Sequence, residues 1–264
     1  QFLCVLCVLC GLNCGFKDYM LLSGNDPQQL CRWHVYRSAA DLELAAQRAI
    51  LGAAQQAVRS RGVFRIVLAG GTTPRRVYEL LRDADADWAA WHVYFGDERC
   101  LPTDHPERNS RMAAQAWLNH VAIPPGQIHF MPAENGAEAA AGAYARVVAE
   151  VSMFDLVLLG LGEDGHTASL FPGHVWGGAP DAPDALAVFD SPKPPPQRVS
   201  LSARRLSASR QVLFLVTGAT KQQAIRAWRN GESIPATAIV PANGVEIYLE
   251  AGLLETEGYP IPHA

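Results

Sequence analysis

Apolar residues occur in this chain in two patterns. Short apolar runs, such as FRIVL at residues 64–68 and VLFLV at residues 212–216, are bounded by glycine or polar residues. Such runs are typical of strands that are buried on both faces of a parallel sheet. Between them, apolar residues recur every three or four positions, as in amphipathic helices. The predicted strands are residues 64–68, 92–95, 128–131, 155–159, 198–201, 212–216 and 245–249.

The helical stretches also carry recognisable end signals. Ser38 is a suitable N-cap for the first helix and Gly62 stops it, while Pro74 suits the first position of the second helix. The predicted helices are residues 38–60, 75–82, 110–120, 137–151 and 218–229. Strands that alternate with helices predict a three-layer α/β fold, with a mostly parallel sheet and helices on both faces. Residues 179–197 are rich in Pro and Asp, which predicts a surface linker or flap.

Composition and charge narrow the class of protein. The chain has 264 residues, of which 49% are hydrophobic and 18% charged, as in an ordinary globular α/β protein. Its net charge of −4 gives no general attraction to nucleic acid or to an anionic membrane surface. No run is long and apolar enough to predict a membrane span. Any site for a phosphate must therefore be built locally.

The beginning of the chain departs from this pattern. Its cysteines follow C-x2-C-x2-C-x3-C, the spacing of an iron–sulfur loop, but Val and Leu fill the gaps and no Pro follows the last one. We interpret residues 1–19 as a fusion scar, a wrong start or a disordered extension, and predict an extension over residues 1–30 and a single domain over 31–264. Isolated Cys31 and Cys100 suit a reducing compartment. The cysteines of the early group are Cys4, Cys7, Cys10 and Cys14.

The most informative stretch is residues 154–173, FDLVLLGLGEDGHTASLFPG. Its glycines bend the chain directly after a buried strand, at the edge where open α/β sheets place their ligands. His166 is the best candidate for a general base, because its ordinary pKa lies near neutrality, and Asp164 could orient its ring. A solvated loop and a metal site are the alternatives, but further ligands at metal-binding spacing are missing. Ser169 lacks the flanking glycines of a nucleophile elbow.

A second group of residues is suited to an anion. Gly70, Gly71, Thr72 and Thr73 join a strand end to a helix start, where free N–H groups favour a phosphate, although a plain turn has the same composition. Asp97-Glu98-Arg99 ends the next strand and is either a solvated loop or the polar floor of a site. Three cations could clamp a phosphate or could simply be surface residues: Arg99, Arg198 and Lys221.

Four blocks, in this order, resemble the 6-phosphogluconolactonase family. They are GGTTP at residues 70–74, FGDERCLPTDHPERNS at 95–110, the 154–173 stretch, and RVSLSARRLSASRQVLFLVTGATKQQAI at 198–225. The resemblance implies a fold like that of glucosamine-6-phosphate deaminase and ribose-5-phosphate isomerase. It implies hydrolysis of 6-phospho-D-glucono-1,5-lactone in the oxidative pentose phosphate pathway, without a metal or organic cofactor. We also expect a cytoplasmic protein, either a monomer or a weak homodimer, with no nucleic-acid or membrane partner.

The resemblance also implies roles for single positions. It makes His166 the base that activates water, with Asp164 beside it. It places Asp97, Arg99 and Asn109 at the sugar pocket, and Thr72 stands where a Ser is usual. The phosphate-side positions that it implies are Gly70, Gly71, Thr72, Thr73, Arg198 and Lys221.

Two rival functions stay open from the sequence. Related amino-sugar-phosphate deaminases carry a Glu five residues after the histidine, where this chain has Phe171, which cannot transfer a proton. A non-catalytic sugar-phosphate sensor would keep the phosphate loop but would not need His166. Substitution of His166 would separate the sensor from the hydrolase.

Overall fold

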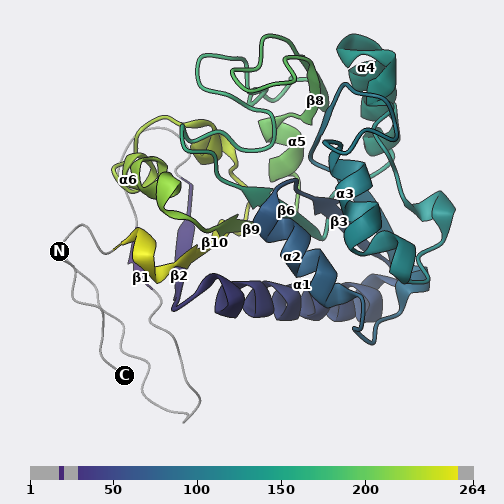
Figure 1. Cartoon of the computed structure of the whole chain (residues 1–264), viewed down its shortest axis with the longest axis horizontal. Coiled ribbons are helices and arrows are strands. Elements are labelled where there is room, and N and C mark those ends of the chain that lie inside the picture. Colours follow the sequence, from purple (N-terminus) through teal and green to yellow (C-terminus); the bar gives the residue numbers. More distant parts are fainter. Residues whose placement is uncertain (1–17, 21–28, 255–264) are drawn as a thin grey trace.

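The computed structural model describes residues 18–20 and 29–254 and centres on one large sheet (Figure 1). The strand order is β1-β2-β10-β9-β6-β3-β4, and every neighbouring pair is parallel except β1 and β2. This sheet confirms the predicted mostly parallel α/β class. Its strands are β1 (Asp18–Met20), β2 (Cys31–Tyr36), β3 (Phe64–Leu68), β4 (Trp91–Phe95), β6 (Leu156–Gly160), β9 (Val212–Val216) and β10 (Val245–Glu250).

Helices cover both faces of this sheet. In Figure 1, α1 lies along the lower side of the strands, with α2 beside it, and α4 and α5 lie above them. Strands β6 and β9 between these layers are almost wholly buried, as their unbroken apolar sequences require. The helices are α1 (Ala39–Arg61), α2 (Thr72–Leu81), α3 (Asn109–Ala116), α4 (Ala137–Ala149), α5 (Ala203–Ser207) and α6 (Gln222–Arg229).

A small antiparallel sheet lies outside the main one and corrects two predictions. Its order is β5 (Asp97–Arg99), β8 (Arg198–Leu201) and β7 (Ala185–Val188). The charged triplet after β4 is therefore a strand and not a loop, because β8 supplies backbone hydrogen-bond partners across it. Strand β7 lies inside the predicted flap at residues 179–197 and packs against α4.

Several predicted boundaries were wrong for local reasons. Residues 128–131 make only an isolated bridge from Ile128 to Val93, because prolines flank the run and cannot donate to a ladder. The helix predicted over residues 110–120 ends at Ala116, and Leu118–His120 continues as a 3-10 helix. Helix α2 begins at Thr72, so Pro74 is its third residue, where a missing N–H still costs nothing.

The start of the chain leaves the domain prediction open. The four closely spaced cysteines of residues 4–14 lie outside the described residues. Strand β1, which pairs with β2, falls inside the predicted extension, and a domain boundary at residue 30 stays a prediction. In the described part of the chain, none of the helices has both the length and the apolar character needed to cross a membrane.

The strand order determines where a site can form. Polar loops leave the carboxyl ends of β9, β6, β3 and β4, four strands that are consecutive neighbours in the sheet. After β3 the chain continues through α2 to β4, whereas after β6 it proceeds to β9 on the opposite side. Open α/β sheets bind their ligands at such a change of direction. The loops after β3 and β6 are those in which the sequence placed its phosphate and general-base candidates.

Candidate active site

A glycine turn after β6 positions His166. The Gly162 N–H donates to the His166 carbonyl at 2.7 Å, and the Gly165 N–H donates to the Gly162 carbonyl at 3.1 Å. Gly165 has a φ of +84°, a conformation that side-chain-bearing residues rarely adopt. A Cβ on Gly162 would lie 2.0 Å from His166 Nδ1. Glycine at position 162 therefore lets the imidazole fold back against its own turn.

Asp164 holds the imidazole in one orientation. Its Oδ1 lies 2.5 Å from His166 Nδ1 and also accepts the His166 backbone N–H at 3.2 Å. A carboxylate can only accept, so the proton resides on Nδ1 and the Nε2 lone pair is left for chemistry. On its other side the imidazole meets the buried ring of Phe171, with ring centroids 4.8 Å apart.

The surroundings keep this pair in the form that a general base needs. Burial lowers the pKa of His166 below 6.5, and the charge of Asp164 opposes that shift only in part. Burial alone would raise the pKa of Asp164, but the charge and hydrogen bonds of His166 bring it below its ordinary value. Near neutral pH, the site therefore holds a neutral imidazole next to an ionised carboxylate, which is suited to taking a proton from water.

The loop after β3 has the geometry of an anion site. Gly71 is the N-cap of α2 with a φ of +106°, and no side chain caps the helix there. The amides of Thr72 and Thr73 therefore point out of the first turn without helical partners. The Thr73 hydroxyl lies 2.6 Å from that of Thr217, which ties this loop to the loop after β9. A Cβ on Gly70 would lie only 2.1 Å from the side-chain oxygen of Asn109, so the close approach requires glycine.

Asp97 and Asn109 meet in a buried hydrogen-bond network. Asn109 Nδ2 donates to Asp97 Oδ1 at 3.0 Å, and Ser169 Oγ donates to Asp97 Oδ2 at 2.5 Å. All three side chains are buried. Ser169, which the sequence excluded as a nucleophile, thus links the His166 turn to β5 and to the start of α3.

Glu98 was not singled out by sequence reasoning, yet it organises this wall of the site. Its carboxylate accepts the backbone N–H groups of Asn109 at 2.8 Å and Ser110 at 2.9 Å, and so caps α3. Arg108 Nε lies 3.3 Å from the same carboxylate, and both side chains are almost completely buried. The available signal was a carboxylate inside the Asp-Glu-Arg triplet, eleven residues before the start of α3.

The predicted cations have different surroundings. Arg99 donates from Nη1 to the Glu107 carbonyl. Arg198 is buried, and its guanidinium donates to backbone carbonyls of the predicted flap, as described further below. Lys221 is half-buried next to the His166 turn, where burial, and then the neighbouring charge of Lys193, lower its pKa. Lys193 lies inside the Pro-rich flap and was missed by the sequence analysis.

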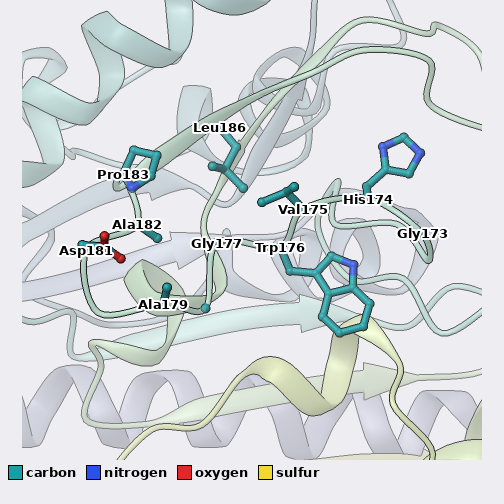
Figure 2. Close-up of a pocket in the computed structure, with 11 residues that line it drawn as sticks. Gly173, His174, Val175, Trp176, Gly177, Ala179, Asp181, Ala182, Pro183 and Leu186 are labelled. Atoms are coloured by element: carbon teal, nitrogen blue, oxygen red, sulfur yellow. The ribbon is translucent and has the colours of Figure 1, made fainter.

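An open cavity of about 740 Å³ lies beside this site and not within it. In Figure 2, Val175 and Trp176 flank it on one side and Asp181 and Pro183 on the other. None of the residues predicted for the site lines it. The two regions adjoin at Phe171, whose carbonyl accepts the Trp176 indole N–H at 2.7 Å.

Comparison with known proteins places this arrangement in a family. The family of glucosamine-6-phosphate isomerases and 6-phosphogluconolactonase matches residues 37–248. The chain belongs to this family. It is 36% identical over 230 residues to the 6-phosphogluconolactonase of Mycobacterium leprae, covering 81% of this chain and 91% of that protein. It is 39% identical over 216 residues to that of Mycobacterium tuberculosis, covering 75% and 87%.

Solved structures agree with membership of the glucosamine-6-phosphate isomerase/6-phosphogluconolactonase family. The 6-phosphogluconolactonase of Thermotoga maritima aligns with a TM-score of 0.77 at 27% identity, covering 83% of this chain and 99% of that one. A monomeric glucosamine-6-phosphate deaminase aligns with a TM-score of 0.72 at 19% identity, which shows a shared fold alone. The family resemblance read from the four sequence blocks is thus confirmed.

Proposed function

We propose that this protein hydrolyses 6-phospho-D-glucono-1,5-lactone to 6-phospho-D-gluconate, in the oxidative pentose phosphate pathway, with His166 as the general base. The observation that carries the proposal is the oriented His166–Asp164 pair, within the charge field of Lys221 and on the loop after β6, the strand that pairs with β3, whose own loop leads to the uncapped N-terminus of α2. The relatives named 6-phosphogluconolactonase add support, because the chain spans most of their length.

The proposed reaction follows from the free Nε2 of His166. Nε2 takes a proton from water, and the water oxygen attacks C1 of the lactone. The negative charge that develops on the carbonyl oxygen is stabilised by nearby N–H groups or a cation. The bond from C1 to the ring oxygen then breaks, and the ring oxygen takes the proton back from His166. Asp164 stabilises the imidazolium that exists between these two transfers.

The phosphate of the substrate is far from C1 and serves for positioning. The first-turn amides of α2, at Thr72 and Thr73, and the ammonium group of Lys221 suit a dianion. Binding energy from this remote group orients the lactone against His166. Phe171 favours the hydrolase over an amino-sugar deaminase, because a buried phenyl ring cannot relay a proton.

The remaining expectations are proposals from the sequence. We propose that the protein acts in the cytoplasm, as a monomer or weak homodimer, and needs neither a metal nor an organic cofactor. Among residues 18–20 and 29–254, no group of three or more His, Cys, Asp or Glu side chains is arranged to hold a metal ion.

The decisive experiment is lactone hydrolysis by the wild-type protein, His166→Ala and the control His120→Ala, with the spontaneous rate subtracted. His120 is exposed on a 3-10 helix away from the β6 loop. Loss of a general base typically costs about 10²–10⁴-fold in kcat, so we expect such a loss in His166→Ala alone. Full activity in His166→Ala would remove His166 from its role. No activity in the wild-type protein would refute the lactonase.

A further inference from the structure

The tip of the flap, residues 190–197, is fixed by its own hydrogen bonds. Ser191 Oγ donates to the Lys193 carbonyl at 2.8 Å and accepts the Lys193 N–H at 3.3 Å. The Ser191 N–H donates to the Pro196 carbonyl at 3.0 Å. These bonds close the tip into a compact loop with Lys193 at its centre.

Arg198 attaches this tip to the site. From its buried position on β8, it donates to the carbonyls of Pro195 at 3.2 Å, Lys193 at 3.0 Å and Pro194 at 3.1 Å. Its guanidinium also lies 5.5 Å from the centre of the Phe171 ring, which packs against His166. The backbone of Lys193 is therefore held in place by a residue that shares a neighbour with the catalytic base.

The side chain of Lys193 points back to the His166 turn. Its Nζ lies 3.0 Å from Glu163 Oε1, and Glu163 directly precedes Asp164. Burial is the largest cause that lowers the pKa of Lys221, and the positive charge of Lys193 lowers it further. The pKa of His166 is lowered first by burial, is raised by Asp164, and is lowered to a smaller extent by Lys193. Lys193 thus stands within electrostatic reach of both the proposed base and the proposed phosphate cation.

Lys193 and Lys221 both lie within the charge field of Glu163, and Asp164, which also acts on Lys221, is hydrogen-bonded to His166. The chain has three lysines: Lys17 lies outside the described residues, and the other two stand together here. The carboxylate paired with Lys193 belongs to Glu163, whose side chain is 54% exposed, while that of Lys193 is 41% exposed. Exposed ion pairs contribute little, so a doubly charged ligand can replace Glu163 at small cost.

We propose that Lys193 is a substrate-binding residue that the flap supplies, and that it binds the phosphate of the substrate together with Lys221 in place of Glu163. This inference rests on the proposed function, because it assigns the phosphate end of the same site. It gives the flap a role in specificity, since a lactone without phosphate offers nothing to exchange for Glu163.

The test compares Lys193→Met with Lys193→Arg, with the control Arg59→Met, all in the full chain. Arg59 is exposed in the last turn of α1, at the opposite end of the sheet, and its substitution also removes one positive charge. A lost charge-assisted bond to phosphate should raise KM for the phosphorylated lactone about 10- to 100-fold in Lys193→Met, with kcat little changed. Hydrolysis of unphosphorylated glucono-1,5-lactone should not change, and Lys193→Arg should recover most of the affinity.

Glu163→Gln should have the opposite effect on affinity from Lys193→Met. It frees Lys193 from its present partner, so 6-phosphogluconate should bind about two- to fivefold more tightly by calorimetry. Equal KM values in wild-type protein and Lys193→Met, together with unchanged binding in Glu163→Gln, would overturn the inference and leave a surface ion pair.

A direct measurement keeps this inference separate from the lactonase proposal. With only three lysines in the chain, ¹³C labelling at the lysine Cε gives a spectrum in which Lys193→Arg assigns the Lys193 signal. Inorganic phosphate should shift the Lys193 and Lys221 signals together in the wild-type protein. This shift is expected even if the protein hydrolyses no lactone, and it does not require Lys193→Met to fold. A Lys193 signal that ignores saturating phosphate and 6-phosphogluconate would refute its role.

Discussion

Replacing Gly162 by Ala should remove activity and leave the fold intact. The added Cβ would lie 2.0 Å from Nδ1 and 2.2 Å from Cε1 of His166, whereas ordinary contact begins at 3.4 Å. The ring must therefore move by at least about 1.4 Å, which also breaks its 2.5 Å hydrogen bond to Asp164. A displacement of about 1 Å at a reacting group can cost about 100-fold in rate, equivalent to roughly 2.7 kcal/mol. We expect at least that loss in kcat.

Gly160→Ala is the matched control for this prediction. Gly160 is the last residue of β6, two residues before Gly162, and a Cβ on Gly160 would meet no atom within 4 Å. Its activity should equal that of the wild-type protein, and its stability should be unchanged or higher by up to about 1 kcal/mol, because alanine restricts the unfolded chain. Steady-state hydrolysis and thermal unfolding of both variants decide the matter. Equal kcat in Gly162→Ala and Gly160→Ala would refute the argument that the site depends on this ring position.

Further predictions concern pH and stability. Because burial lowers the pKa of His166, kcat/KM should rise with pH to a plateau with a midpoint below 6.5, and Asp164→Asn should move that midpoint lower still. An upward shift in Asp164→Asn would contradict this assignment. Glu98→Ala removes the cap of α3 and one of the two carboxylates paired with the buried guanidinium of Arg108, which keeps Glu134, so urea unfolding should show a loss of about 2–4 kcal/mol. The exposed Glu79→Ala should change stability by no more than about 0.5 kcal/mol, and equal losses in the two variants would argue against the network.

The main sheet could be predicted because its strands have local signals. The runs at β3 and β9 are apolar at nearly every position, since both faces of these strands are covered, and their predicted bounds match the structure. Strand β2, CRWHVY, lies between β1 and β10, is only partly buried and mixes polar with apolar residues, so its sequence resembles a loop. The short strands β5 and β7 depend on β8 for their hydrogen bonds, and that pairing has no local signature.

The same distinction explains which site residues could be predicted. His166 and Asp164 lie two residues apart in one glycine turn, so a single motif contains both the proposed base and the carboxylate that is hydrogen-bonded to its ring. The network of Asp97, Asn109 and Ser169 spans more than 70 residues. The residue pattern raised Asp97 as part of a charged triplet, and only the family resemblance indicated Asn109. From the sequence alone, Ser169 shows only that it lacks the flanking glycines of a nucleophile elbow, and nothing indicates that its hydroxyl bonds to Asp97.

The position of Lys193 next to Glu163 could not be predicted from the sequence of the flap. A segment rich in Pro and Asp predicts an exposed linker, and a lysine in such a segment is ordinarily solvated. Here Arg198, one residue past the flap, uses its guanidinium to hold three consecutive flap carbonyls, beginning with that of Lys193. Arg198 was predicted as a direct phosphate cation, but its hydrogen bonds in this structure go to the flap. On the proposal that Lys193 binds the phosphate, the contribution of Arg198 is the position that its hydrogen bonds give to Lys193. Arg198→Lys keeps the charge but loses the three-carbonyl geometry, so we expect it to raise KM nearly as much as Lys193→Met.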